Sequence, residues 1–139
     1  KWLERDLQAS RKPWKLVFGH LPAFPQPDRD WKEPEEEPEE HHLPSRKRER
    51  FWTVLEERGV AAYLCADTHR YSRFRPAGSR VWQIDTAQAR GGKSWKFDAF
   101  LIVTADARTL RFDVYRNLKE EGKFEITDTL TLQAPGAAP

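Results

Sequence analysis

Residues 60–73 read VAAYLCADTHRYSR, and this stretch joins an apolar run directly to a polar cluster. The run at 60–65 is short and rich in aliphatic and aromatic side chains, which predicts a buried strand. Asp67 and His69 follow it at once. Open α/β sheets usually place ligand chemistry just past the carboxyl ends of their strands. We therefore expect an α/β fold with functional side chains at the end of this strand.

A second apolar run ends in a similar way nearer the N-terminus. Residues 14–18 (WKLVF) predict a short strand, and Gly19 and His20 follow it. On an extended segment, Asp67 and His69 would point the same way, so that they could reach one metal or two adjacent metals. Imidazole and carboxylate groups together suit ions such as Zn, Mn and Fe. The alternative is that each histidine is a hydrogen-bonded structural residue and that Asp67 forms a turn.

The rest of the chain predicts further elements of a mixed α/β fold in which helices cover a sheet. Apolar periodicity predicts helices at 2–11, where Trp2, Leu3 and Leu7 share a face, and at 49–58, which Gly59 ends. The C-terminal part is rich in predicted strands, and a turn that begins at Asp106 is expected between two of them. The further strands lie at 80–85, 99–104, 110–116 and 124–132, with a glycine-containing loop at 86–97 and antiparallel meander pairing expected for the last three.

Two segments fall outside this pattern. Residues 25–50 are rich in proline and in blocks of both charge signs, which oppose a packed core and predict a long exposed loop. Residues 134–139 (APGAAP) predict a flexible tail. We therefore expect one domain over 1–133, with the charged loop as an insertion.

Composition excludes few classes of protein function, but it sets some limits. The net charge is +2, so charge alone gives no specific nucleic-acid signal. No apolar run approaches the roughly 20 residues of a membrane span, and Cys65 is the only cysteine, which rules out an internal disulfide. The chain starts at Lys1 and contains no methionine, which indicates a processed product, a trimmed chain or a fragment. The sequence does not indicate a cellular compartment.

Several segments, in order along the chain, resemble the C-terminal half of calcineurin-like metallophosphoesterases, in the purple-acid-phosphatase-like superfamily. The resemblance covers roughly residues 1–116. The segments are WLE at 2–4 leading to KLVFGHLP at 15–22, FW at 51–52 in the helix before the last metal strand, LCADTHRYSR at 64–73, and VWQI at 81–84 with glycines at 91 and 92.

The resemblance implies part of a four-layered α/β/β/α sandwich with two divalent metal ions, Mn, Fe or Zn, at the sheet ends. His20 matches the lone metal histidine of the family, and His69 matches the second histidine of its GHxH motif. Asp67 stands where the first histidine of that motif would be, and Ala66 replaces its glycine. An aspartate can also bind a metal, but its carboxylate is a harder ligand, in the sense of hard and soft bases, than imidazole. The site is therefore either retained with an altered metal preference or degenerate.

The N-terminal half of the family supplies a D-x-H motif, a bridging aspartate and an Asn-His pair whose histidine is the general acid. None of these precedes His20, because only 19 residues do. No catalytic residue is therefore matched in this chain, and only part of the metal site is present. The resemblance implies part of a phosphomonoesterase or phosphodiesterase that is inactive as this isolated chain and needs the missing N-terminal half as its partner. The alternative is a non-catalytic, degenerate phosphoesterase-like module with a binding or structural role.

Two residues next to the metal candidates are expected to bind the phosphoester substrate. Arg70 could contact a phosphate oxygen through its planar guanidinium, or it could pair with a surface carboxylate. Tyr71 could line the pocket, or it could pack against the sheet. The sequence does not decide between the two alternatives for Arg70 or between the two for Tyr71.

Overall fold

The computed structural model describes residues 1–25, 42–89, 98–120 and 122–134. Most of the predicted charged loop, the glycine pair Gly91-Gly92 and nearly all of the predicted tail lie outside the described residues. The elements, in chain order, are α1 (Trp2–Ala9), β1 (Leu16–Phe18), α2 (Ser45–Glu57), β2 (Ala62–Cys65), β3 (Tyr71–Phe74), β4 (Trp82–Thr86), β5 (Ala99–Ala105), β6 (Thr109–Arg116) and β7 (Glu125–Gln133).

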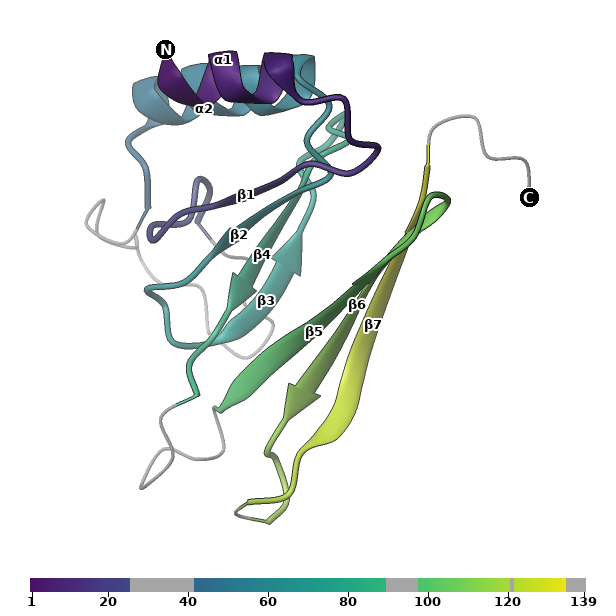
Figure 1. The fold of residues 1–139 in the computed structure, drawn as a ribbon. Coiled ribbons are helices and arrows are strands. Elements are labelled where there is room, and N and C mark those ends of the chain that lie inside the picture. The colour runs from purple at the N-terminus through teal and green to yellow at the C-terminus, as the bar shows by residue number, and fades with distance from the viewer. Residues whose placement is uncertain (26–41, 90–97, 121, 135–139) are drawn as a thin grey trace.

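The first sheet has the strand order β1-β2-β4-β3 (Figure 1). Strands β1, β2 and β4 are parallel, and β3 pairs antiparallel with β4 at one edge. All four residues of β2 are buried, as a strand covered on both faces requires. The buried strand expected in the 60–65 run is thereby confirmed, whereas β3 was not predicted.

The two helices cover one face of this sheet. Leu7 of α1 and Trp52 and Leu55 of α2 are buried in one apolar cluster with Val17 of β1 and Tyr63 of β2. The spacing of three between Trp52 and Leu55 places both on the same side of the helix. No helix among the described residues is long and apolar enough to cross a membrane.

Both helix predictions are confirmed, with three corrections. Helix α1 ends at Ala9 rather than at 11. Trp2 does not join the buried face of α1, because its side chain is 70% exposed while Leu7 makes the core contact. Helix α2 begins at Ser45 rather than at 49, and its first turn is closed by the Pro44 carbonyl, which accepts from the backbone N–H groups of Lys47 and Arg48. The charged residues 45–50 are therefore helical. Gly59 has φ 67°, as expected of the glycine that ends the helix.

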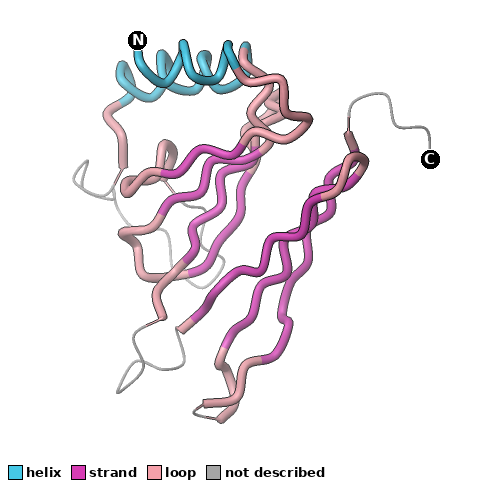
Figure 2. The backbone as a smooth tube through the Cα atoms, in the orientation of Figure 1, coloured by secondary structure: helices cyan, strands magenta, loops and turns pink. Residues whose placement is uncertain are grey.

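The second sheet is the predicted antiparallel meander β5-β6-β7 (Figure 2). The carboxylate of Asp106 closes the first turn by accepting from the N–H groups of Arg108 and Thr109 at 2.6 and 2.8 Å. Leu110, Phe112 and Leu130 of this sheet pack against the face of the first sheet that the helices leave open, where they meet Ala62, Leu64 and Ile84. The described residues thus form three layers, α/β/β, and the fourth layer of the expected sandwich is not among them.

Candidate functional site

The predicted polar clusters lie side by side at the carboxyl ends of β1 and β2. The parallel pairing continues past the strands, because Gly19 N–H donates to the Leu64 carbonyl at 3.0 Å and Ala66 N–H donates to the His20 carbonyl at 2.9 Å. This pairing brings His20 Nε2 to within 3.1 Å of Asp67 Oδ1. The imidazole is 74% exposed and the carboxylate 21% exposed. The structure therefore brings together two of the three predicted metal ligands.

The segment that carries Asp67 and His69 is not extended. Both residues have left-handed backbone conformations, with φ 74° and 60°, and the N–H of Thr68 donates back to the Ala66 carbonyl at 3.0 Å. The backbone between Asp67 and His69 is therefore not extended, contrary to the assumption behind the expected common direction of their side chains. That common direction stays a prediction. His69 is exposed, and the described residues contain no group of three or more His, Cys, Asp or Glu side chains placed to hold one metal.

Asp85, at the carboxyl end of β4, is a residue that sequence reasoning missed. Its side chain is fully buried and accepts from Thr68 Oγ1 at 2.5 Å and from the N–H of Ala87 at 3.0 Å. Thr86 Oγ1 also donates to the Cys65 carbonyl at 3.1 Å. The turn after β2 is thus anchored to the end of β4. The sequence signal for Asp85 was its place at the end of an otherwise uncharged run. A carboxylate buried with such a run needs hydrogen-bond partners, which indicates a structural contact near this position.

Tyr63 holds the segment that carries His20. Its hydroxyl donates to the Leu21 carbonyl at 2.7 Å, and burial, reinforced by the nearby Cys65, raises its pKa to about 12. The phenol therefore stays a donor throughout the physiological range. Gly19 passes so close that a Cβ at this position would collide with the Tyr63 hydroxyl. Glycine at 19 is required here by the close approach.

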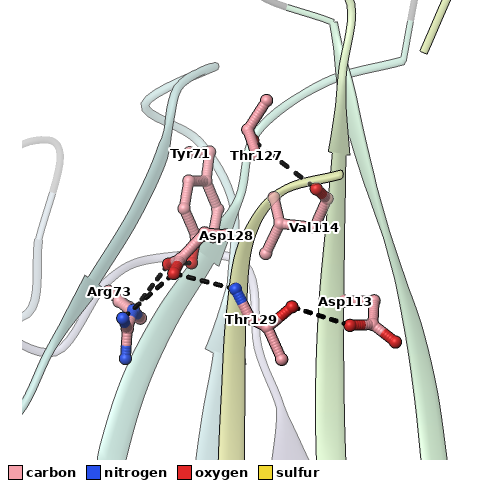
Figure 3. Close-up of polar contacts among 7 residues, drawn as sticks. All are labelled: Tyr71, Arg73, Asp113, Val114, Thr127, Asp128 and Thr129. Carbon is pink, nitrogen blue, oxygen red and sulfur yellow. Dashed lines mark hydrogen bonds and ion pairs between the residues drawn. The ribbon is translucent and has the colours of Figure 1, made fainter. Parts of the chain in front are cut away.

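The Tyr71 side chain joins the two sheets. Its hydroxyl donates to Asp128 Oδ2 of β7 at 2.6 Å, and Arg73 of β3 binds both oxygens of the same carboxylate, at 2.6 and 3.0 Å (Figure 3). The N–H of Thr129 donates to Asp128 as well, at 2.9 Å. Of the two alternatives for Tyr71, these contacts favour packing against the sheet. A contact of Tyr71 with substrate stays a prediction.

The contact between Tyr71 and Asp128 shifts the pKa values of both side chains. Burial pushes the pKa of Asp128 upward, but the hydrogen bonds from Tyr71 and Arg73 and the charge of Arg73 outweigh it, so this pKa lies below its ordinary value. Burial and the hydrogen bond to Asp128 raise the pKa of Tyr71. At neutral pH the carboxylate is charged and the phenol neutral, which is the pairing that binds the sheets together.

Substituting Asp128→Asn should lower the free energy of unfolding by about 1–2 kcal/mol at neutral pH, because the charge-assisted bonds to Arg73 are lost. A depressed pKa contributes stability above the ordinary value of 3.8, and this contribution disappears as pH falls through the folded-state value. The gap between wild type and variant should therefore narrow below that pH. Urea denaturation across the acid range measures it, with Glu120→Gln in the exposed Lys123–Glu120 pair as control. A gap that does not change with pH would contradict this assignment.

Arg70 is half-buried in the turn, and its N–H and carbonyl lie 3.3 Å from Thr68 Oγ1. A contact between its guanidinium and phosphate stays a prediction.

Comparisons with known proteins show a likeness of fold. No protein-family model and no curated protein sequence matches the chain. The crystal structure of Vps29 from Chaetomium thermophilum superposes with a TM-score of 0.51 at 17% identity, over 91% of this chain and 58% of that one. A second structure of that protein, in complex with the RaPID-derived cyclic peptide RT-D3, gives a TM-score of 0.46 at 18% identity, over 67% and 53% of the two chains. Vps29 has a metallophosphoesterase-like fold, and the chain, which spans a little over half of its length, is similar to that fold in outline.

Proposed function

We propose that this chain is part of a metallophosphoesterase-fold protein and acts there as a non-catalytic binding or structural module. The proposal is carried by the geometry of the D-x-H segment. Left-handed turns at Asp67 and His69 replace the extended arrangement that would aim both side chains at one centre. The sequence departures from the family motif, Ala66 for glycine and Asp67 for histidine, fall in this same segment.

The described residues do not fit a complete dimetal centre. Transition-metal sites of this kind take at least four ligands per ion. His20 and Asp67 supply one adjacent pair, and within the described part of the chain His69 does not join them in a group of three.

A second candidate function, a share in a dimetal phosphoesterase centre, is favoured by one distance. Two ligands bound to one ion at about 2.1 Å lie about 3.4 Å apart at the tetrahedral angle and about 3 Å apart at the right angle of an octahedral site. His20 Nε2 lies 3.1 Å from Asp67 Oδ1, within this range. In this hypothesis His20, Asp67 and His69 are metal ligands and Arg70 and Tyr71 meet the phosphoester. The further ligands and the general acid would come from an N-terminal half of the domain.

Metal titration of the natural protein that carries these residues separates the two functions. For the proposed module, calorimetry with Mn²⁺ and Zn²⁺ should give the same heats for wild type and for the double variant His20→Ala/His69→Ala. Hydrolysis of p-nitrophenyl phosphate and its diester should be equally low in both. Saturable binding that the double variant loses, together with a drop in hydrolysis of orders of magnitude, would establish the second candidate and refute the first.

A further inference from the structure

A cavity of about 420 Å³ lies at the end of the first sheet opposite to His20 and Asp67. Its walls include the residues at or just before the amino ends of β2 and β4, the end of α2, and the last residues of β7. His20, Asp67 and Asp85 follow or end the same parallel strands at their carboxyl ends. The volume is within the range of small-molecule sites. A ligand here would not touch the candidate metal ligands.

Two arginines give this cavity an excess of positive charge. Arg75 and Arg80 line it together with a single acidic side chain, Glu56. Within the described part of the chain, neither arginine forms an ion pair with an acidic residue. Arg73, on the neighbouring strand β3, differs in this respect, because its guanidinium is already held by Asp128. With respect to the described residues, the guanidinium donors of Arg75 and Arg80 are therefore available for an oxyanion, which they can bind in a planar fork.

Tryptophan side chains supply apolar surface beside these charges. Trp14 and Trp82 both line the cavity. The guanidinium of Arg75 lies 5.1 Å from the centre of the Trp82 ring, close enough for a cation–π contact. The indole of Trp14 is fixed at its other end, because Nε1 donates to the Asp106 carbonyl at 2.7 Å. The guanidinium of Arg73 lies over the same Trp82 ring, at 5.4 Å from its centre. A planar apolar group thus finds indole side chains next to positive charge.

The C-terminal end of α2 faces the cavity. Its carbonyl groups are hydrogen-bonded, so they do not repel an anion as unpaired carbonyl groups would. The carbonyls of Val54, Leu55 and Glu56 accept from the N–H groups of the residues that end the helix, at 2.9–3.1 Å. Lys15 Nζ donates to the Arg58 carbonyl at 2.8 Å. The partial negative charge expected at the C-terminus of a helix is therefore largely met by donors.

We propose that this cavity binds a small aromatic anion, a planar ring that carries a phosphate or carboxylate group. The ring lies against Trp14 and Trp82, and the oxyanion is bound by Arg75 and Arg80. This ligand class follows from the pairing of indole walls with guanidinium groups that lack an acidic partner in the described part of the chain. The proposal holds whether or not the other end of the sheet binds metal, so its failure would leave the proposed function standing.

The test follows the indole N–H signals of ¹⁵N-labelled protein during titration with 1-naphthyl phosphate and with 1-naphthoate. Saturable shifts of the Trp14 and Trp82 signals are expected with at least one of the two, and the stronger probe identifies the headgroup. Neutral 1-naphthol and inorganic phosphate each lack half of the recognised chemistry and should bind at least about tenfold more weakly. The double variant Arg75→Gln/Arg80→Gln should raise the Kd of the stronger probe by at least about tenfold.

The matched control is Arg11→Gln/Arg108→Gln, which removes the same charge from two exposed arginines outside the cavity lining. This control should leave the Kd within about twofold of wild type. Arg80→Gln alone serves as the second variant if the double variant unfolds. The proposal is overturned if neither naphthyl probe shifts the two indole signals at millimolar concentration. It is also overturned if the cavity variants and the control bind equally well.

Discussion

Replacing Phe112 by alanine should lower the free energy of unfolding by about 3–5 kcal/mol. Phe112 is 1% exposed and is the largest of the fully buried side chains among the described residues. It lies on β6 in the cluster that joins the two sheets, among Leu64, Ile84 and Leu130. Truncation would remove its transfer free energy and leave a cavity that rigid strands on both sides cannot fill. The loss should exceed that of the Gly19→Ala and Asp128→Asn substitutions, because both sheets depend on this layer.

Urea denaturation of Phe112→Ala measures this loss, and Phe100→Ala is the matched control. Phe100 lies on β5 of the same sheet but is 37% exposed, and its ring stacks on Tyr115 at 4.9 Å. The same chemical truncation there leaves no enclosed cavity and should cost clearly less. Equal losses in the two variants would show that the layer between the sheets is not the main core of this half of the chain.

Replacing Gly19 by alanine is expected to destabilise the protein by about 1–3 kcal/mol and to displace the segment that carries His20. The added Cβ would overlap the Tyr63 hydroxyl, which is itself held by the Leu21 carbonyl at 2.7 Å. Tyr63 is 4% exposed and packed under α2, so it has little room to move. Either the tyrosine or the loop must shift, and a loop shift would separate His20 from Asp67.

A double-mutant cycle with Tyr63→Phe tests the cause. Removing the hydroxyl takes away the nearest clashing atom, so Gly19→Ala should cost less in the Tyr63→Phe background than in wild type. Chemical denaturation of the four proteins gives the coupling energy. Costs that simply add would mean that Gly19 is needed for a reason other than its distance from Tyr63.

Regular elements with a strong apolar period were predictable from the sequence, and weakly patterned ones were not. The buried run of β2 and the Trp52–Leu55 face of α2 follow from local sequence, because burial on a strand or helix selects apolar residues at fixed spacing. Strand β3 (YSRF) escaped prediction because all four residues are half-buried and do not alternate. Its strand conformation depends on pairing with β4, a neighbour that the local sequence does not reveal.

Strand β7 shows how tertiary pairing overrides a pattern. Strict alternation would place Ile126 and Asp128 on one face of the sheet. A bulge between Val114 and Tyr115 shifts the register, so that Tyr115 pairs with Ile126 while Val114 pairs with Asp128. Ile126 is consequently 50% exposed, and Asp128 reaches Tyr71 and Arg73 of the other sheet. A one-residue bulge turns side chains to the other face.

The sequence by itself determined that polar side chains follow two buried strands, and it named His20, Asp67 and His69 as the candidates. Only the tertiary structure decided which of them meet. The parallel pairing of β1 and β2 placed His20 against Asp67, and the turn after β2 gave Asp67 and His69 left-handed backbone conformations. Side-chain identity is encoded locally, whereas the distance between residues 47 positions apart depends on strand order and backbone dihedrals, which the whole sheet selects.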